Sequence, residues 1–109
     1  MKATLPDPLE AYFGAVNRGD VDAMLAPFAA DAAVRDEGKI RRGHAAVREW
    51  ILETTEKYHP AFEVVDVADE GIGTTVVSGL VSGTFPGSPV RLRYAFTLDA
   101  GKITRLEIT

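Results

Sequence analysis

The hydrophobic pattern of the chain changes its period near the middle. Residues 7–58 place apolar side chains mostly at the spacing of amphipathic helices, whereas residues 60–109 mostly alternate apolar and polar side chains, as strands do. No linker, repeat or low-complexity segment interrupts the 109 residues, and this length is typical of one domain. Helices gathered in one half of a chain and antiparallel strands in the other define the α+β class. We therefore predict a single α+β domain over residues 1–109.

Three helices and one short strand are expected in the first half. Residues that start or stop helices mark each boundary: Asp7 as cap and Pro8 as first helical residue, Gly19 and Asp20 between the first and second helices, Pro27 after the second, and Gly43 and Pro60 around the third. The apolar stripe of the second helix includes Phe28, and that of the third includes Trp50. The short strand is expected at residues 32–36, before a turn at Glu37-Gly38.

Four antiparallel strands are expected in the second half, at residues 62–68, 74–85, 90–98 and 102–109. Tyr94 and Phe96 share the apolar face of the third of these strands.

Gly79 and Gly83 fall inside the second of these strands, residues 74–85, and glycine within a strand often marks a bend. We expect a strongly curved antiparallel sheet that wraps around the three helices as a cone. The helices cannot fill its wide end, so a cavity is expected there.

The composition excludes several classes of function. Without cysteine the chain has no disulfide, thiolate metal site or cysteine nucleophile. The net charge is −4, and the one basic run, Lys39 with Arg41 and Arg42, is too short for a nucleic-acid surface. His44 and His59 are interpreted as exposed helix-boundary residues, and no spacing of ligands predicts a metal site. With no secretory signal and no membrane-spanning stretch in the sequence, we expect a cytoplasmic protein that binds neither nucleic acid nor membrane.

Several segments are similar to those of a known superfamily. They are residues 12–20 (YFGAVNRGD), residues 28–36 (FAADAAVRD), Gly43 ahead of the helix that carries Trp50, and residues 98–103 (LDAGKI). Through them the chain resembles, over nearly its whole length, the nuclear transport factor 2-like superfamily, and in particular its SnoaL-like and ketosteroid isomerase-like members. The resemblance implies a fold and not one function, because this superfold hosts isomerases, dehydratases, cyclases, epoxide hydrolases and non-catalytic binders.

The resemblance implies roles for three side chains. Tyr12 stands where ketosteroid isomerases place an oxyanion-hole tyrosine, and Asp36 stands where they place the general-base carboxylate. Tyr94 stands where those enzymes have a protonated aspartic acid. This departure argues against steroid isomerisation itself, although a tyrosine is also a hydrogen-bond donor. No cofactor is expected, since proton transfer and oxyanion stabilisation need none.

The same residues have ordinary structural interpretations. Asp36 before a Glu-Gly pair fits turn chemistry, and Tyr12 and Tyr94 lie on apolar faces where tyrosines usually belong to the core. Convergence of the three side chains on one cavity would favour the functional interpretation. Four aromatic residues are expected to line that cavity: Trp50, Phe96, Phe28 and Phe85.

Three hypotheses about function stay open at this point. The first is a small acid–base enzyme that acts on an apolar carbonyl compound through Asp36, Tyr12 and Tyr94. The second is a non-catalytic protein that holds an apolar small molecule in the same cavity. The third is a dimeric interaction module. Arg91 and Arg93 lie on the outer face of their strand, and a mixed polar and apolar face of this kind often pairs subunits, so a homodimer is expected.

Overall fold

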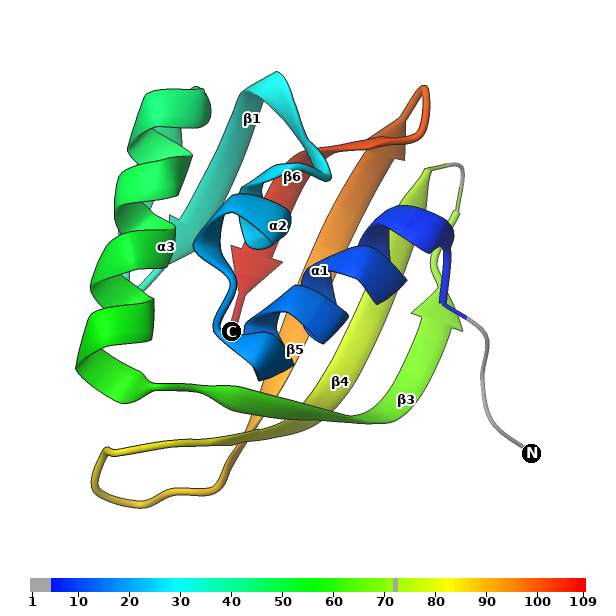
Figure 1. Cartoon of the computed structure of the whole chain (residues 1–109). Coiled ribbons are helices and arrows are strands. Elements are labelled where there is room, and N and C mark those ends of the chain that lie inside the picture. The colour runs from blue at the N-terminus through cyan, green and yellow to red at the C-terminus, as the bar shows by residue number, and fades with distance from the viewer. Residues whose placement is uncertain (1–4, 72) are drawn as a thin grey trace.

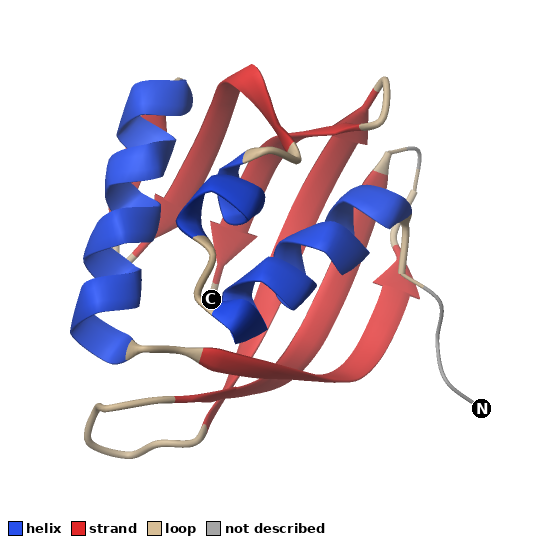
Figure 2. Ribbon diagram, viewed as in Figure 1, coloured by secondary structure: helices blue, strands red, loops and turns tan. Residues whose placement is uncertain are grey.

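The computed structural model describes residues 5–71 and 73–109. In chain order its elements are α1 (Asp7–Arg18), α2 (Val21–Leu25), β1 (Phe28–Asp36), β2 (Lys39–Arg42), α3 (His44–Tyr58), β3 (Ala61–Asp69), β4 (Thr74–Ser82), β5 (Val90–Asp99) and β6 (Lys102–Ile108). The helices all cover one face of a curved sheet, which is the predicted α+β arrangement (Figures 1 and 2). The first four residues, part of the segment in which no secretory signal is expected, lie outside the described residues.

The sheet has six strands in the order β2-β1-β6-β5-β4-β3. Neighbouring strands are antiparallel except β1 and β6, which are parallel, so the expectation of a wholly antiparallel sheet is wrong at this pair. The structure also adds β2 and extends β1 back to Phe28. Residues 28–31 (FAAD) and β2 (KIRR) lack a clear alternation of apolar and polar side chains, which is why the pattern did not reveal them.

The helix boundaries follow the sequence closely, with one exception. Gly19 ends α1 in the left-handed conformation at φ 68°, and the Asp20 carboxylate caps α2 by accepting a hydrogen bond from the Ala23 amide at 3.1 Å. Asp7 is not the cap of α1. Pro6 occupies that position, and Asp7 lies in the first turn, where its negative charge interacts favourably with the helix dipole.

The predictions for Phe28 and Gly83 are wrong. Phe28 does not extend the apolar stripe of α2, because the chain leaves that helix before Pro27 and Phe28 begins β1. Gly83 does not lie inside a strand, since β4 ends at Ser82. Gly79 does lie within β4, where a Cβ atom would come within 2.4 Å of the Glu63 carbonyl oxygen. The β3 strand bulges beside this close approach, and the bulge helps to curve the sheet.

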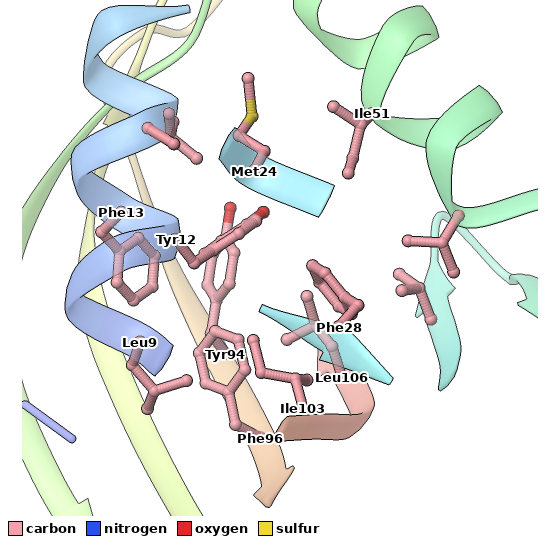
Figure 3. Close-up of a cluster of buried hydrophobic side chains, with 14 of the residues drawn as sticks. Leu9, Tyr12, Phe13, Met24, Phe28, Ile51, Tyr94, Phe96, Ile103 and Leu106 are labelled. Carbon is pink, nitrogen blue, oxygen red and sulfur yellow. The ribbon is translucent and has the colours of Figure 1, made fainter. Parts of the chain in front are cut away.

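The interior is solid at one end of the molecule. We call the fully buried side chains there the packed core: Leu9, Phe28, Phe96, Ile103 and Leu106 (Figure 3). Further along α1, the Asn17 side-chain amide pairs with the backbone of Phe62, donating to its carbonyl at 3.1 Å and accepting from its amide at 2.7 Å. This pairing attaches the end of α1 to strand β3.

Within the described part of the chain, no helix has both the length and the apolar character that crossing a membrane requires.

Candidate functional site

A cavity of about 510 Å³ lies between the helices and the concave face of the sheet. Small-molecule sites commonly have volumes of roughly 300–1,000 Å³, so this space suits a ligand of that class. Its wall is largely apolar and includes Met24, Ile51, Phe62, Val81 and Leu92. Against such a wall the few polar groups that line the cavity determine what it can bind or transform.

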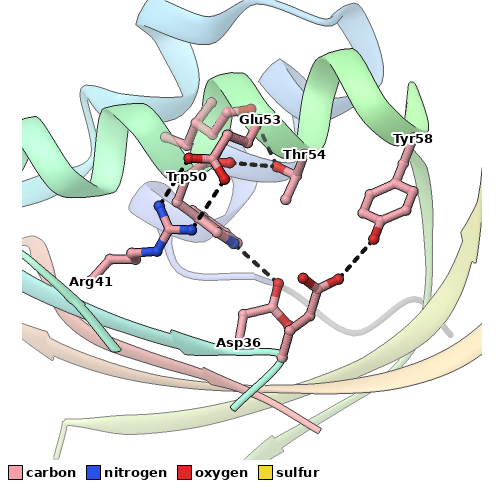
Figure 4. A network of polar contacts seen from close by, with 8 residues as sticks. Asp36, Arg41, Trp50, Glu53, Thr54 and Tyr58 are labelled. Atoms are coloured by element: carbon pink, nitrogen blue, oxygen red, sulfur yellow. Dashed lines mark hydrogen bonds and ion pairs between the residues drawn. The ribbon is translucent and has the colours of Figure 1, made fainter. Parts of the chain in front are cut away.

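Asp36 is the last residue of β1, and its half-buried carboxylate lies beside α3. The Trp50 indole N–H donates a hydrogen bond of 3.1 Å to Asp36 Oδ2 (Figure 4). Burial raises the pKa of Asp36 above its ordinary value, whereas the Trp50 hydrogen bond and the positive charge of Arg41 act in the opposite direction. A carboxylate with a raised pKa in a fixed position is suited to accept a proton from carbon.

Tyr12 on α1 and Tyr94 on β5 bring two phenol groups to the same cavity. Both side chains are buried, with 4% and 9% of their surfaces exposed. Their hydroxyl groups point in the same direction, away from Phe96 (Figure 3). Burial is the main cause of the raised pKa of each tyrosine, and the neighbouring charge of Asp36 raises both pKa values further. Both phenols therefore stay protonated and can donate hydrogen bonds at neutral pH.

The structure thus places Asp36, Tyr12 and Tyr94 around one cavity, although they come from three different elements. The Tyr94 phenol contributes to the raised pKa of Tyr12, and the charge of Asp36 contributes to the raised pKa of both tyrosines. A ligand oxygen beside the two hydroxyl groups would meet a pair of donors, with a carboxylate nearby. This is a set of groups suited to moving a proton and stabilising an oxyanion.

The four expected aromatic wall residues divide into two pairs. Trp50 and Phe85 line the cavity. Phe28 and Phe96 do not, so the prediction that they line it as ligand contacts is wrong. Each lies in the packed core with its ring edge-to-face against Tyr12, at centroid distances of 5.6 Å and 5.9 Å respectively. Phe96 is on the same face of β5 as Tyr94, two residues further along the strand, and is fully buried.

Several polar residues that line the cavity were not predicted from the sequence. Glu37, Thr55, Lys57 and Tyr58 all lie along its wall. Helical spacing puts Tyr58 on the same apolar stripe of α3 as Trp50, but it does not show that the side chain reaches the cavity. No comparable signal distinguishes Glu37 from an ordinary turn residue, because its position at the cavity depends on how β1 packs against α3.

The two histidines lie at helix ends, as expected, but only His59 is exposed. His44 is half-buried, and its Nε2 lies 2.9 Å from the Phe28 carbonyl oxygen, which accepts a hydrogen bond from the ring. In residues 5–71 and 73–109 no group of three or more histidine, aspartate or glutamate side chains is placed to hold a metal ion.

Comparison with family models matches residues 9–106 of the chain to the SnoaL-like domain. Comparison with curated proteins finds no match.

Three solved structures are similar over most of the chain. A Sinorhizobium meliloti protein described as a candidate polyketide cyclase shares 40% identity over 96% of this chain and 95% of its own, with a TM-score of 0.91. A Xanthomonas campestris protein with the same description shares 27% identity over 94% and 86%, with a TM-score of 0.81. The epoxide hydrolase/cyclase-like enzyme SalBIII, which has a role in pyran ring formation in the polyether salinomycin, shares 26% identity over 94% and 86%, with a TM-score of 0.81.

More distant structures, all below 25% identity, support the fold alone. They are described as having a cystatin fold, an NTF2-like fold or a ketosteroid isomerase-like fold. These descriptions agree with the curved sheet and one-sided helices seen here.

Proposed function

The chain belongs to the SnoaL-like domain family of the NTF2-like superfamily, and we propose that it is a cofactor-independent acid–base enzyme for an apolar carbonyl compound. Its fold is of the small-molecule isomerase and cyclase type. The observation that carries the proposal is the placement of one raised-pKa carboxylate and two buried phenols on one apolar cavity. The polyketide cyclase and epoxide hydrolase/cyclase descriptions of its relatives support the same class of chemistry.

In the proposed first step, Asp36 removes a proton from the carbon next to the substrate carbonyl. The C–H bond breaks, an O–H bond forms on the carboxylate, and the electron pair becomes the C=C bond of an enolate. The apolar wall favours this step because a poorly solvated carboxylate is a stronger base toward carbon than one in water.

Tyr12 and Tyr94 stabilise the enolate oxygen in this proposal. Their O–H groups donate hydrogen bonds to the oxygen on which negative charge develops, and their raised pKa values keep them protonated. Donors fixed in an apolar site stabilise this charge more than water does, because they need no reorientation during the reaction.

In the second step the proton held by Asp36 is transferred back, so that atoms and charge balance over the reaction. If protonated Asp36 delivers it to another carbon of the enolate system, the product is an isomer. If the enolate carbon attacks a second carbonyl of the same molecule, a C–C bond forms and the proton goes to the new alkoxide, which gives a cyclised product. Neither route gains or loses electrons overall.

The test measures exchange of the α-protons of 2-tetralone in D₂O by proton NMR. The wild type is expected to accelerate exchange and Asp36→Asn to abolish the acceleration, while the far-ultraviolet circular dichroism stays unchanged. Asp31→Asn is the matched control, since Asp31 is exposed on the same strand and does not line the cavity. Equal acceleration by wild type and Asp36→Asn would contradict the proposal.

A second candidate function is a non-catalytic carrier of an apolar small molecule, which the largely apolar wall of the cavity favours. It predicts that 2-tetralone binds without accelerated exchange and that Asp36→Asn leaves binding unchanged.

Pairing of two copies through the outer face of the sheet, where Arg91 and Arg93 are exposed, stays a prediction, which sedimentation analysis can test.

A further inference from the structure

A second polar feature lies at the exposed edge of the cavity. Glu37, the residue after β1, and Tyr58, the last residue of α3, both line the cavity, and we call them the rim pair. The Tyr58 hydroxyl donates a hydrogen bond of 2.8 Å to Glu37 Oε1 (Figure 4). Asp36, Tyr12 and Tyr94 are buried or half-buried, whereas Glu37 is exposed, so the rim pair forms part of the entrance.

The position of Tyr58 is fixed by contacts with the segment between β4 and β5. The Thr84 amide donates to the Tyr58 carbonyl at 2.8 Å, and the Phe85 ring packs edge-to-face on the Tyr58 ring at 5.6 Å. Gly83 permits this approach, since a Cβ atom there would come within 2.3 Å of the Tyr58 carbonyl oxygen. Tyr58 is therefore held at three points: its backbone carbonyl, its ring and its hydroxyl group.

Glu37 occupies a backbone conformation that is unfavourable for its residue type. Its φ is 53°, and the following Gly38 has φ 75°, so the pair makes a turn in which asparagine, aspartate or glycine usually stands first. A glutamate there is strained unless other contacts offset the strain. The hydrogen bond from Tyr58 is such a contact, and it holds the Glu37 carboxylate at the cavity.

Charges at the entrance favour a neutral ligand group. Glu37 is an anion, and the Lys57 ammonium lies 5.0 Å from the centre of the Tyr58 ring. A cationic ligand would be attracted by Glu37 but repelled by Lys57, and an anionic one would be attracted by Lys57 but repelled by Glu37 and Asp36. A neutral hydroxyl group meets neither repulsion, and a carboxylate that already accepts one hydrogen bond still has capacity to accept another.

We propose that the rim pair is a specificity-determining subsite for a neutral hydroxyl group, which donates to Glu37 while the apolar body of the ligand fills the cavity. This inference deepens the proposed function by naming its substrate class: neutral, largely apolar carbonyl compounds that carry a hydroxyl group remote from the reacting carbonyl. The carbonyl lies beside Tyr12 and Tyr94, and the hydroxyl group lies at the entrance.

The test compares 6-hydroxy-2-tetralone with 6-methoxy-2-tetralone, which lacks only the donor. Isothermal titration calorimetry is expected to show about tenfold tighter binding of the hydroxy compound to the wild type, as for a hydrogen bond to a charged group. Glu37→Gln is expected to reduce this preference at least about threefold. Glu37→Asn suits the positive φ and shortens the side chain, so it is expected to remove the preference without unfolding the protein.

Glu56→Gln is the matched control, since Glu56 is exposed on α3 and does not line the cavity. Equal affinity of the wild type for the two compounds, no measurable binding of the hydroxy compound, or an unchanged preference in both Glu37 variants would overturn the inference. The proposed function fails separately. If the wild type prefers the hydroxy compound but does not accelerate α-proton exchange, the subsite stands and the catalytic proposal does not.

Discussion

Tyr94 and Phe96 follow each other on one face of β5, yet they belong to different regions of the molecule. Phe96 is fully buried in the packed core, whereas Tyr94 lines the cavity. Their rings stack with centroids 6.1 Å apart, so the boundary between the solid and the hollow interior passes between neighbouring side chains. Burial does not distinguish them well, since Tyr94 is itself only 9% exposed. What distinguishes the two residues is the hydroxyl group of Tyr94.

Tyr12 marks the same boundary from the helical side. Its ring packs edge-to-face on Phe28 and Phe96, while the residue also lines the cavity. A hydroxyl group in a solid core would need a hydrogen-bond partner, because an unpaired buried polar group is destabilising. In this molecule the hydroxyl groups of Tyr12 and Tyr94 lie where close packing stops.

The largest expected effect separates the two regions by stability. Phe96→Ala removes a fully packed ring and is expected to lower the free energy of unfolding by about 3–5 kcal/mol. Tyr94→Phe keeps the ring and is expected to change it by less than about 1 kcal/mol. Urea unfolding of both variants checks this. Similar losses for the two would mean that the boundary does not lie between these residues.

The next effect separates the same regions by activity. Tyr94→Phe and Tyr12→Phe each remove one proposed oxyanion donor, so each is expected to slow α-proton exchange of 2-tetralone about 10²-fold. Phe28→Leu in the packed core serves as control and is expected to leave the exchange rate of the folded protein near that of the wild type. Unchanged exchange in both tyrosine variants would show that their hydroxyl groups do not act on the carbonyl oxygen.

A smaller effect concerns how α3 sets the pKa of Asp36. Trp50→Phe removes the hydrogen bond that stabilises ionised Asp36, so the pKa of Asp36 is expected to rise further. A base acts when deprotonated, so the exchange rate should increase with pH through that pKa, and its inflection should move to higher pH in the variant. An unmoved inflection in the pH–rate profile would assign Trp50 to the wall only.

The raised pKa also has a consequence for stability. In the pH window between the ordinary pKa of Asp36 and its raised value, the folded state binds more protons than the unfolded state. The contribution of Asp36 to the free energy of unfolding therefore decreases as pH rises through this window. Asp36→Asn should remove that decrease, which urea unfolding at several pH values can measure.

Three residues of the candidate site could be predicted from the sequence, but the full set of residues that line the cavity could not. Asp36, Tyr12 and Tyr94 were predicted, through the resemblance, as site residues, and the structure places all three on the cavity. Glu37 could not be predicted, because a turn residue reaches a cavity only if its hairpin packs against a particular helix. Phe28 was misplaced because the chain ends α2 one turn earlier than its apolar residues suggest.

The sequence alone determined the order of most helices and strands, the α+β class and the apolar faces, since these depend on local periodicity, caps and turns. The tertiary structure alone decided the parallel pairing of β1 with β6 and which buried aromatic residues face a hollow. Pairing and packing join residues distant in the chain, and no short-range pattern records which of two adjacent apolar side chains will meet a neighbour and which will meet open space.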